Sequence, residues 1–269
     1  MAGRRPECAR CAATIARDMR PEDIRLASVA AWLGSSERIV VFSGAGLSKA
    51  SGIPTYRDGG GLWTKAGNMR FAHADALAED TPAFLDFWAR RRTEIESAQP
   101  NPGHLALAQL QHARPLTTLA TQNVDGLLAK AGAREVLELH GNLLRTRCQA
   151  CGAGNPAADE RSHCLACGSV EPSVRPDVVM FGEMLDPAVL ARAESDAECC
   201  ELLLAVGTSA VVYPAAGLIE KAKSRGARVA VINAEPIELA HLTDAEVIGA
   251  SEELLPRLMS MAGIGTSPR

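Results

Sequence analysis

The sequence lacks a long apolar run, an excess of basic residues and an apolar N-terminal signal. A membrane-spanning helix needs about 20 consecutive apolar residues, so we expect no membrane partner. Lysine and arginine total 28 against 32 aspartates and glutamates, and this balance gives no overall signature for direct nucleic-acid binding. The missing secretory signal predicts a cytoplasmic protein with reduced thiols.

Four of the eight cysteines form two closely spaced pairs, Cys148-x2-Cys151 and Cys164-x2-Cys167, with twelve residues between them. Two such turns can offer four thiolates to one tetrahedral ion, and zinc is the metal expected for these ligands. Four protein ligands leave no position for water or substrate, so we expect this zinc to stabilise the fold. The alternative is two disulfides, which would require an oxidising compartment.

Short apolar runs alternate with helical patterns along most of the chain. Strands are expected at residues 38–43, 116–122, 136–139, 201–206 and 228–232. Helices are expected at residues 21–33, 103–112, 187–199, 214–225 and 251–261. This alternation predicts an α/β fold, a Rossmann-like doubly wound parallel sheet that binds ligands at the carboxyl ends of its strands.

Two segments, residues 54–102 and 144–172, break the alternation. We expect them to form a smaller zinc-binding domain, in which a helical cofactor-loop module with a helix near residues 82–97 joins the four-cysteine zinc ribbon. The Rossmann-like NAD-binding domain then comprises residues 21–53, 103–143 and 173–262. Residues 1–20, which contain the unpaired motif Cys8-x2-Cys11, and residues 263–269 are expected to be flexible tails.

The first predicted strand runs into a loop of small residues, Gly44-Ala45-Gly46-Leu47-Ser48. Small residues let the backbone approach a pyrophosphate, and a following helix can present free amides to it. The usual dinucleotide fingerprint has a third glycine where Lys49 stands, and an acidic residue about 20 residues further on is also missing. This departure disfavours a hydride-transferring oxidoreductase. The glycine-rich stretch that follows, residues 51–63, is suited to covering a bound ligand.

Several segments together resemble the sirtuin family, in particular the short bacterial-type sirtuins that include desuccinylases. They are GAGLSKASGIPTYR, TQNVDGLLAKAG, the His140-Gly141 pair, the two CxxC pairs, RPDVVMFGE, GTSAVVYP and INAE, and the similarity extends from about residue 20 to residue 258. The resemblance implies NAD-dependent removal of acyl groups from protein lysines. NAD and zinc would then be the cofactors, and acylated-lysine proteins the partners.

The resemblance also implies the mechanism and its base. In this family the acyl oxygen attacks a ribose carbon as nicotinamide leaves, and a base then activates a ribose hydroxyl. That base would be His140, since an unperturbed imidazole titrates near pH ~6.5 and can accept a proton at neutral pH. Without the resemblance, a lone histidine after a strand would be assigned to packing or capping.

The remaining cofactor-binding residues are likewise implied by the resemblance. The phosphates are assigned to Gly44, Ala45, Gly46 and Ser48. The nicotinamide and ribose pocket is assigned to Asn123 and Asp125, which also count as catalytic, with Gln122 and Val124 beside them and a loop above that carries Tyr56, Arg57 and Trp63. The adenosine half is assigned to Gly207, Thr208, Ser209, Asn233, Ala234, Glu235 and Ala250. On their own, Asn123 and Asp125 would be turn formers.

The acylated peptide is expected to pair with an extended segment, residues 178–183, by strand addition. The residues implied for this contact are Val179, Met180, Phe181, Gly182 and Glu183. The alternative is an internal strand of the large domain.

Acyl preference depends on two helical positions. Relatives that remove succinyl or malonyl groups carry Tyr-x-x-Arg, whereas this chain has Trp88 and Arg91. Arg91 can pair with a carboxylate and the Trp88 indole can donate one hydrogen bond, but helix packing and a solvated charge are the alternative. Ala72 stands at a position that those relatives also keep small. We therefore predict a lysine deacetylase, with desuccinylase or demalonylase activity and protein ADP-ribosyl transfer as alternatives.

Overall fold

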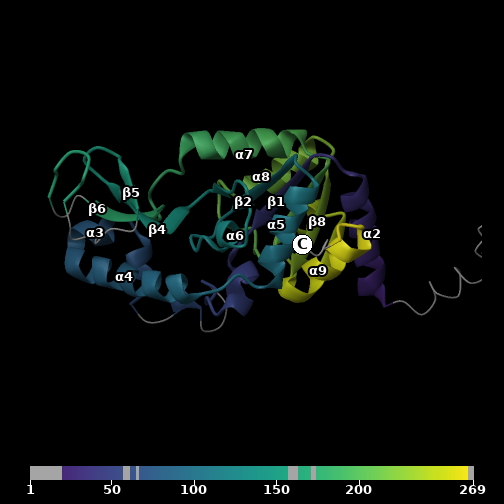
Figure 1. Ribbon diagram of the computed structural model, residues 1–269, viewed down its shortest axis with the longest axis horizontal. Helices are drawn as coiled ribbons and strands as arrows, with labels where there is room; N and C mark the ends of the chain where they lie inside the picture. Colours follow the sequence, from purple (N-terminus) through teal and green to yellow (C-terminus); the bar gives the residue numbers. More distant parts are fainter. Residues whose placement is uncertain (1–19, 57–60, 65–66, 157–162, 171–173, 266–269) are drawn as a thin grey trace, which may run out of the picture.

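The protein, described by a computed structural model over residues 20–56, 61–64, 67–156, 163–170 and 174–265, contains two sheets (Figure 1). The larger is a parallel sheet of six strands in the order β3-β2-β1-β7-β8-β9. Its strands are β1 (Ile39–Ser43), β2 (Thr117–Thr121), β3 (Leu137–Glu138), β7 (Leu202–Val206), β8 (Arg228–Asn233) and β9 (Ala245–Ile248). The chain order reverses between β1 and β7, which is where such sheets bind ligands. The predicted doubly wound α/β fold is confirmed.

Helices cover both faces of this sheet because its strands are buried on both sides. Successive residues of β1 point to opposite faces, so Ile39 and Val41 pack into one apolar cluster while Val40 and Phe42 pack into the other. The first cluster includes residues of α2 (Pro21–Ser35), α5 (Pro102–Ala113) and α9 (Ser251–Met261), and the second includes residues of α7 (Pro187–Cys199) and α8 (Gly217–Ser224). Of the described helices, none is long and apolar enough to cross a membrane.

The segments expected in a smaller domain lie together at the end of the molecule away from α2 and α9 (Figure 1). One contributes α3 (Asp75–Glu79) and α4 (Thr81–Ser97), where Asp80 caps α4 by accepting a hydrogen bond from the Ala83 amide at 3.2 Å. The other lies in the antiparallel sheet β5-β4-β6, to which it contributes β5 (Gly154–Pro156) and most of β4 (Gly141–Cys148). The third strand, β6 (Val174–Val178), comes from residues that were expected in the large domain. We propose that the domain boundary falls after residue 178, because β6 pairs with β4 and not with the parallel sheet.

A few elements differ from the sequence-based expectation. Strand β9 was not predicted, because it has four residues and includes Glu246. Helix α8 begins at Gly217, after a turn that holds Tyr213 and Pro214. Short helical turns also occur, namely η1 (Ala45–Ser51), η2 (Leu62–Thr64), η3 (Met69–Ala72), α6 (Leu127–Lys130) and η4 (Ala240–Leu242). Cys8 and Cys11 lie outside the described residues.

Candidate functional site

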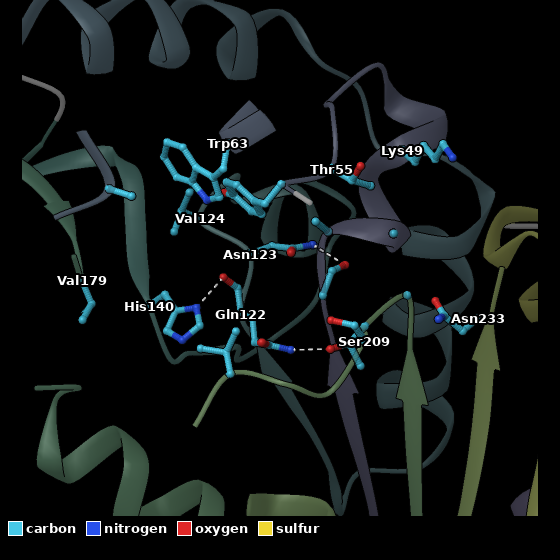
Figure 2. Close-up of a pocket in the computed structure, with 18 of the residues that line it drawn as sticks. Lys49, Thr55, Trp63, Gln122, Asn123, Val124, His140, Val179, Ser209 and Asn233 are labelled. Atoms are coloured by element: carbon cyan, nitrogen blue, oxygen red, sulfur yellow. Dashed lines mark hydrogen bonds between the residues drawn. The ribbon is translucent and has the colours of Figure 1, made fainter. Parts of the chain in front are cut away.

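A cleft of about 630 Å³ lies where the loops after β1, β2, β7 and β8 meet (Figure 2). It brings together most of the residues that the sequence indicated. These are Gly44, Ala45, Gly46, Tyr56, Trp63, Ala72, Trp88, Gln122, Asn123, Val124, His140, Val179, Met180, Phe181, Gly182, Glu183, Gly207, Thr208, Ser209, Asn233, Ala234, Glu235 and Ala250. Of the described residues predicted to bind cofactor or substrate, three do not line it: Ser48, Asp125 and Arg91 border a much smaller cavity beside it. Arg57 lies outside the described residues.

Further residues line the cleft that sequence reasoning did not single out. They are Lys49, Thr55, Leu185, Val212, Tyr213, Pro214, Pro236, Gly249, Ser251 and Glu252, while Val178, the first residue of the predicted substrate segment, also lines it. Each lies within a few residues of a predicted segment, so extending those segments by one turn would have found them.

The small-residue loop after β1 packs directly against the loop after β7. The Gly46 amide donates a hydrogen bond to the carbonyl oxygen of Gly207 at 2.8 Å. Gly207 has φ +57°, and a Cβ there would lie 2.3 Å from the Leu47 nitrogen. Glycine is therefore required at position 207 by the close approach of two backbones.

His140 has one ring nitrogen held by the protein, while the other has no hydrogen-bond partner among the residues that the structure describes. Its Nδ1 lies 3.0 Å from the carbonyl oxygen of Gln122, which can only accept, so Nδ1 carries the proton. Figure 2 shows this hydrogen bond at the edge of the cleft. Burial lowers the pKa of His140, although the hydrogen bond to Gln122 opposes this shift. The ring is therefore neutral at pH 7, and its Nε2 can accept a proton.

A buried hydrogen-bond network supports the floor of the cleft. Ser48 donates to Asp125 Oδ2 at 2.6 Å and accepts from Asn123 Nδ2 at 3.1 Å. His104 Nε2 lies 3.3 Å from the same hydroxyl, and His104 Nδ1 accepts the Asn101 amide, so Nε2 is the protonated nitrogen that donates to Ser48. All of the hydrogen-bonding positions of the Ser48 hydroxyl are thereby occupied.

Burial shifts the pKa values of both ionisable groups in this network toward the neutral form. It lowers the pKa of His104 to about 4 and raises the pKa of Asp125, against the hydrogen bond from Ser48. Sequence reasoning missed His104. The signal was available in Asn101-Pro102-Gly103-His104, which also forms the capping box of α5.

Two buried polar atoms in cleft-lining residues have no hydrogen-bond partner within the described residues: Asn123 Oδ1 and Ser251 Oγ. Asn123 follows β2, and Ser251 begins α9. A buried carbonyl or hydroxyl oxygen without a partner is costly, so a ligand that brings donors to both places would be stabilised. NAD carries amide and hydroxyl groups of this kind, and the cleft residues fit it.

The four predicted zinc ligands meet at one point. The sulfur atoms of Cys148, Cys151, Cys164 and Cys167 all lie within 4.8 Å of one another, with 3.8 Å between Cys148 and Cys167 and 3.7 Å between Cys151 and Cys164. A tetrahedron with Zn–S bonds of about 2.3 Å requires sulfur separations of about 3.8 Å. The site is therefore shaped for one zinc ion.

The wall of the cleft toward α4 is aromatic. Trp63 stacks on Tyr56 and Phe87, with ring centroids 5.5 and 6.1 Å away. The indole nitrogen of Trp88 donates to the carbonyl oxygen of Phe71 at 3.2 Å. In this structure the indole proton is therefore used within the protein, which favours the helix-packing alternative for Trp88.

Arg91 forms an ion pair within its own helix. Its side chain is 11% exposed and pairs with Glu94, one turn further along α4. It borders the small cavity and does not line the main cleft. Trp88 and Arg91 both border the small cavity, where the Trp88 indole donates to the Phe71 carbonyl oxygen and Arg91 pairs with Glu94.

The predicted substrate segment, residues 178–183, bridges the two parts of the molecule. The Val179 amide donates to the carbonyl oxygen of His140 at 3.0 Å, and the Phe181 amide donates to that of Ala72 at 2.8 Å. The Ala74 amide in turn donates to the carbonyl oxygen of Phe181 at 3.1 Å. Val178 ends β6, so this segment is not an internal strand of the parallel sheet.

Comparison with known proteins gives consistent matches. A model of the Sir2 family matches residues 44–214. The chain is 44% identical over 237 residues to NAD-dependent protein deacylase 2 of Pyrobaculum aerophilum, with 86% of this chain and 94% of the relative covered. It is 41% identical over 239 residues to the NAD-dependent protein deacylase of Ralstonia nicotianae, with 87% and 96% covered.

Solved structures agree with this similarity. The crystal structure of a Sir2 homologue in complex with NAD superposes with a TM-score of 0.81 at 36% identity, covering 88% of this chain and 94% of that one. A Sir2 structure with a deacetylated p53 peptide and 3'-O-acetyl ADP ribose has a TM-score of 0.80 at 28% identity, covering 88% and 98%.

Proposed function

The chain belongs to the Sir2 family and is an NAD-dependent protein-lysine deacylase, and we propose that it acts on acetyl-lysine with His140 as its general base. The observation that carries this proposal is the Nε2 of His140 at the edge of the cleft, which no described residue hydrogen-bonds, on a ring fixed by the carbonyl oxygen of Gln122. A binding module or an oxidoreductase would not require a neutral histidine at this place.

NAD, when bound, supplies an electrophilic ribose carbon that accepts the acyl oxygen as nicotinamide leaves. His140 then takes a proton from a ribose hydroxyl through Nε2, while Nδ1–H stays on the Gln122 carbonyl. Its lowered pKa keeps the ring neutral and able to accept that proton. The imidazolium formed in this step is stabilised by the same carbonyl oxygen.

Asn123 and Asp125 hold the nicotinamide and its ribose in this proposal. Asn123 donates through Nδ2 to Ser48 and to the Gly44 carbonyl oxygen, which fixes the amide and leaves Oδ1 to accept from the ligand. The amides of the Gly44 loop bind the phosphates. Residues after β7, β8 and β9 hold the adenosine half, with Gly207, Thr208, Ser209, Asn233, Ala234, Glu235 and Ala250 lining that part of the cleft. Ser48 acts behind the cleft, by orienting Asn123 and Asp125.

The acylated peptide is proposed to bind along residues 179–183. The backbone of Gly182 makes no hydrogen bond to any other described residue, and a Cβ there would meet nothing within 4 Å. These free main-chain groups at the cleft suit pairing with an extended peptide.

The acyl pocket favours a small, uncharged group. Trp63 and Trp88 present aromatic surface to the cleft, the Trp88 donor is used by Phe71, and Arg91 is paired with Glu94. A succinyl carboxylate entering this wall would lose its water and would have to compete with Glu94 for the charge of Arg91, which is costly. Acetyl-lysine therefore suits this pocket better than acidic acyl-lysines.

The test is to incubate the protein with NAD and matched acetyl-lysine and succinyl-lysine peptides, and to follow peptide mass and nicotinamide release together. We expect acetyl removal in step with nicotinamide release and much slower succinyl removal. The variant Arg91→Ala should leave the ratio of the two rates unchanged. Fast succinyl removal that is lost in Arg91→Ala would contradict the acyl preference, and nicotinamide release without peptide change would indicate ADP-ribosyl transfer instead.

A reducing compartment such as the cytoplasm completes the proposal. A zinc site made of four cysteines requires its sulfurs as thiolates, which an oxidising compartment would convert to disulfides.

A further inference from the structure

Glu183 borders the substrate cleft, but its carboxylate is already bound by three groups of the protein. Arg175 Nη2 lies 2.6 Å from Oε1 and 2.7 Å from Oε2, and Arg147 Nη2 lies 3.1 Å from Oε2. The Met180 amide donates to the same Oε2 at 2.9 Å. The carboxylate therefore has little capacity left for a substrate.

The two arginines belong to the zinc-bearing sheet. Arg147 on β4 is paired in register with Arg175 on β6, and each stands next to a residue of the zinc-site core. Arg147 immediately precedes the ligand Cys148, while Arg175 follows Val174, which packs against Cys148 and Cys164. A continuous set of contacts thus connects the zinc ligands through the two arginines to Glu183.

The contact between Glu183 and the two arginines is electrostatic as well as steric. The Arg175 side chain is 2% exposed and that of Arg147 is 33% exposed, so two like charges lie side by side with limited solvent. Glu183 is the carboxylate that both contact, and Arg175 depends on it for charge neutralisation. The Met180–Glu183 turn is consequently held to the zinc-bearing sheet by strong, charge-assisted hydrogen bonds.

We propose that Glu183 is a positioning residue whose side chain fixes the substrate-binding segment to the zinc-bearing sheet, and that its carboxylate does not itself contact substrate. Met180 would be held through its amide, and Phe181 next to it through Ala72, so the segment is presented to the peptide in one conformation. The zinc site would then contribute to peptide binding at a distance, by holding Arg147 and Arg175 in register. The kinetic consequence depends on the proposed function; the structural consequence does not.

The test compares Glu183→Gln with Arg145→Gln as a matched control. Arg145 lies on the same strand as Arg147 but pairs with Glu138 and Asp177, away from Glu183. Because a charge-assisted hydrogen bond is replaced, we expect Glu183→Gln to raise the KM for the acetyl-lysine peptide about tenfold. The kcat, the KM for NAD and the zinc content should stay close to those of the wild type. Arg145→Gln should change none of these quantities.

Hydrogen–deuterium exchange supplies a readout that does not depend on activity. Exchange at Met180 and Phe181 should be faster in Glu183→Gln than in the wild type, and that of β1 should be unchanged. If neither exchange nor peptide KM changes, the proposal is overturned. If the wild type removes no acyl group, the proposed function fails and the exchange comparison still decides the role of Glu183.

A folding defect would be recognised by zinc loss or by faster exchange throughout the chain. In that case Arg147→Gln replaces Glu183→Gln, since it removes one of the two arginine contacts and leaves the more buried Arg175 paired. Faster hydrogen–deuterium exchange confined to the region of Met180, with zinc retained, supports the proposal. Unchanged exchange at Met180 overturns it.

Discussion

His104 should make the stability of the fold depend on pH in a measurable way. The side chain is fully buried, and burial lowers its pKa from 6.5 to about 4. In the unfolded chain the imidazole binds a proton below about pH 6.5, whereas in the folded chain it stays neutral until about pH 4. Between these values the unfolded state binds more protons, so folding becomes less favourable as the pH falls.

The size of the effect follows from the shift. A difference of about 2.5 pKa units corresponds to about 3 kcal/mol over the whole window, of which about 2 kcal/mol is lost by pH 5. Replacing His104 by Asn removes this pH-dependent contribution to the free energy of unfolding. It also removes the hydrogen bond to Ser48, which should cost about 1 kcal/mol at neutral pH.

The measurement is urea unfolding of wild type and His104→Asn near pH 7.5 and near pH 5. We expect the variant to be less stable at the higher pH, and the difference to shrink by about 2 kcal/mol, or to change sign, at the lower pH. Ala108→Gly, at a buried position of the same helix, carries no titrating group and serves as control. Its destabilisation should be the same at both pH values. If the difference in unfolding free energy between wild type and His104→Asn were the same at both pH values, burial would not keep the imidazole neutral.

Three further outcomes are expected. His140→Ala should lower kcat by about 10²–10⁴-fold with NAD affinity nearly unchanged. In the wild type, kcat/KM should fall as the pH is lowered, and the midpoint of this fall should lie below pH 6.5 because burial lowers the pKa of His140. Cys164→Ser should release zinc and lower the melting temperature, as measured by metal analysis and calorimetry, while Cys199→Ser, an exposed cysteine outside the cluster, should do neither. Gly207→Ala should destabilise the fold by about 1–3 kcal/mol and weaken NAD binding by isothermal titration, because of its positive φ and its contact with Leu47; wild-type behaviour would contradict the packing argument.

Local patterns in the sequence were sufficient for most of the sheet, its helices and the zinc site. The strand β1 could be predicted because all five of its residues are buried, which leaves a continuous apolar run. The zinc ligands could be predicted because each pair lies within one tight turn, so its spacing is set locally. Strand β9 was missed because its four residues alternate between buried and half-buried positions and include Glu246.

By itself, the sequence determined which residue types are available at the cleft, and its motifs indicated where His140, Asn123 and the glycine loop would meet. The tertiary structure decided what those groups can still do. The Trp88 indole gives its single N–H to the Phe71 carbonyl oxygen, and the Arg91 charge is paired with Glu94 beside the small cavity and outside the main cleft. Hydrogen-bond capacity is limited, and a donor used by another part of the protein is lost to the substrate; that choice depends on packing, which no local pattern contains.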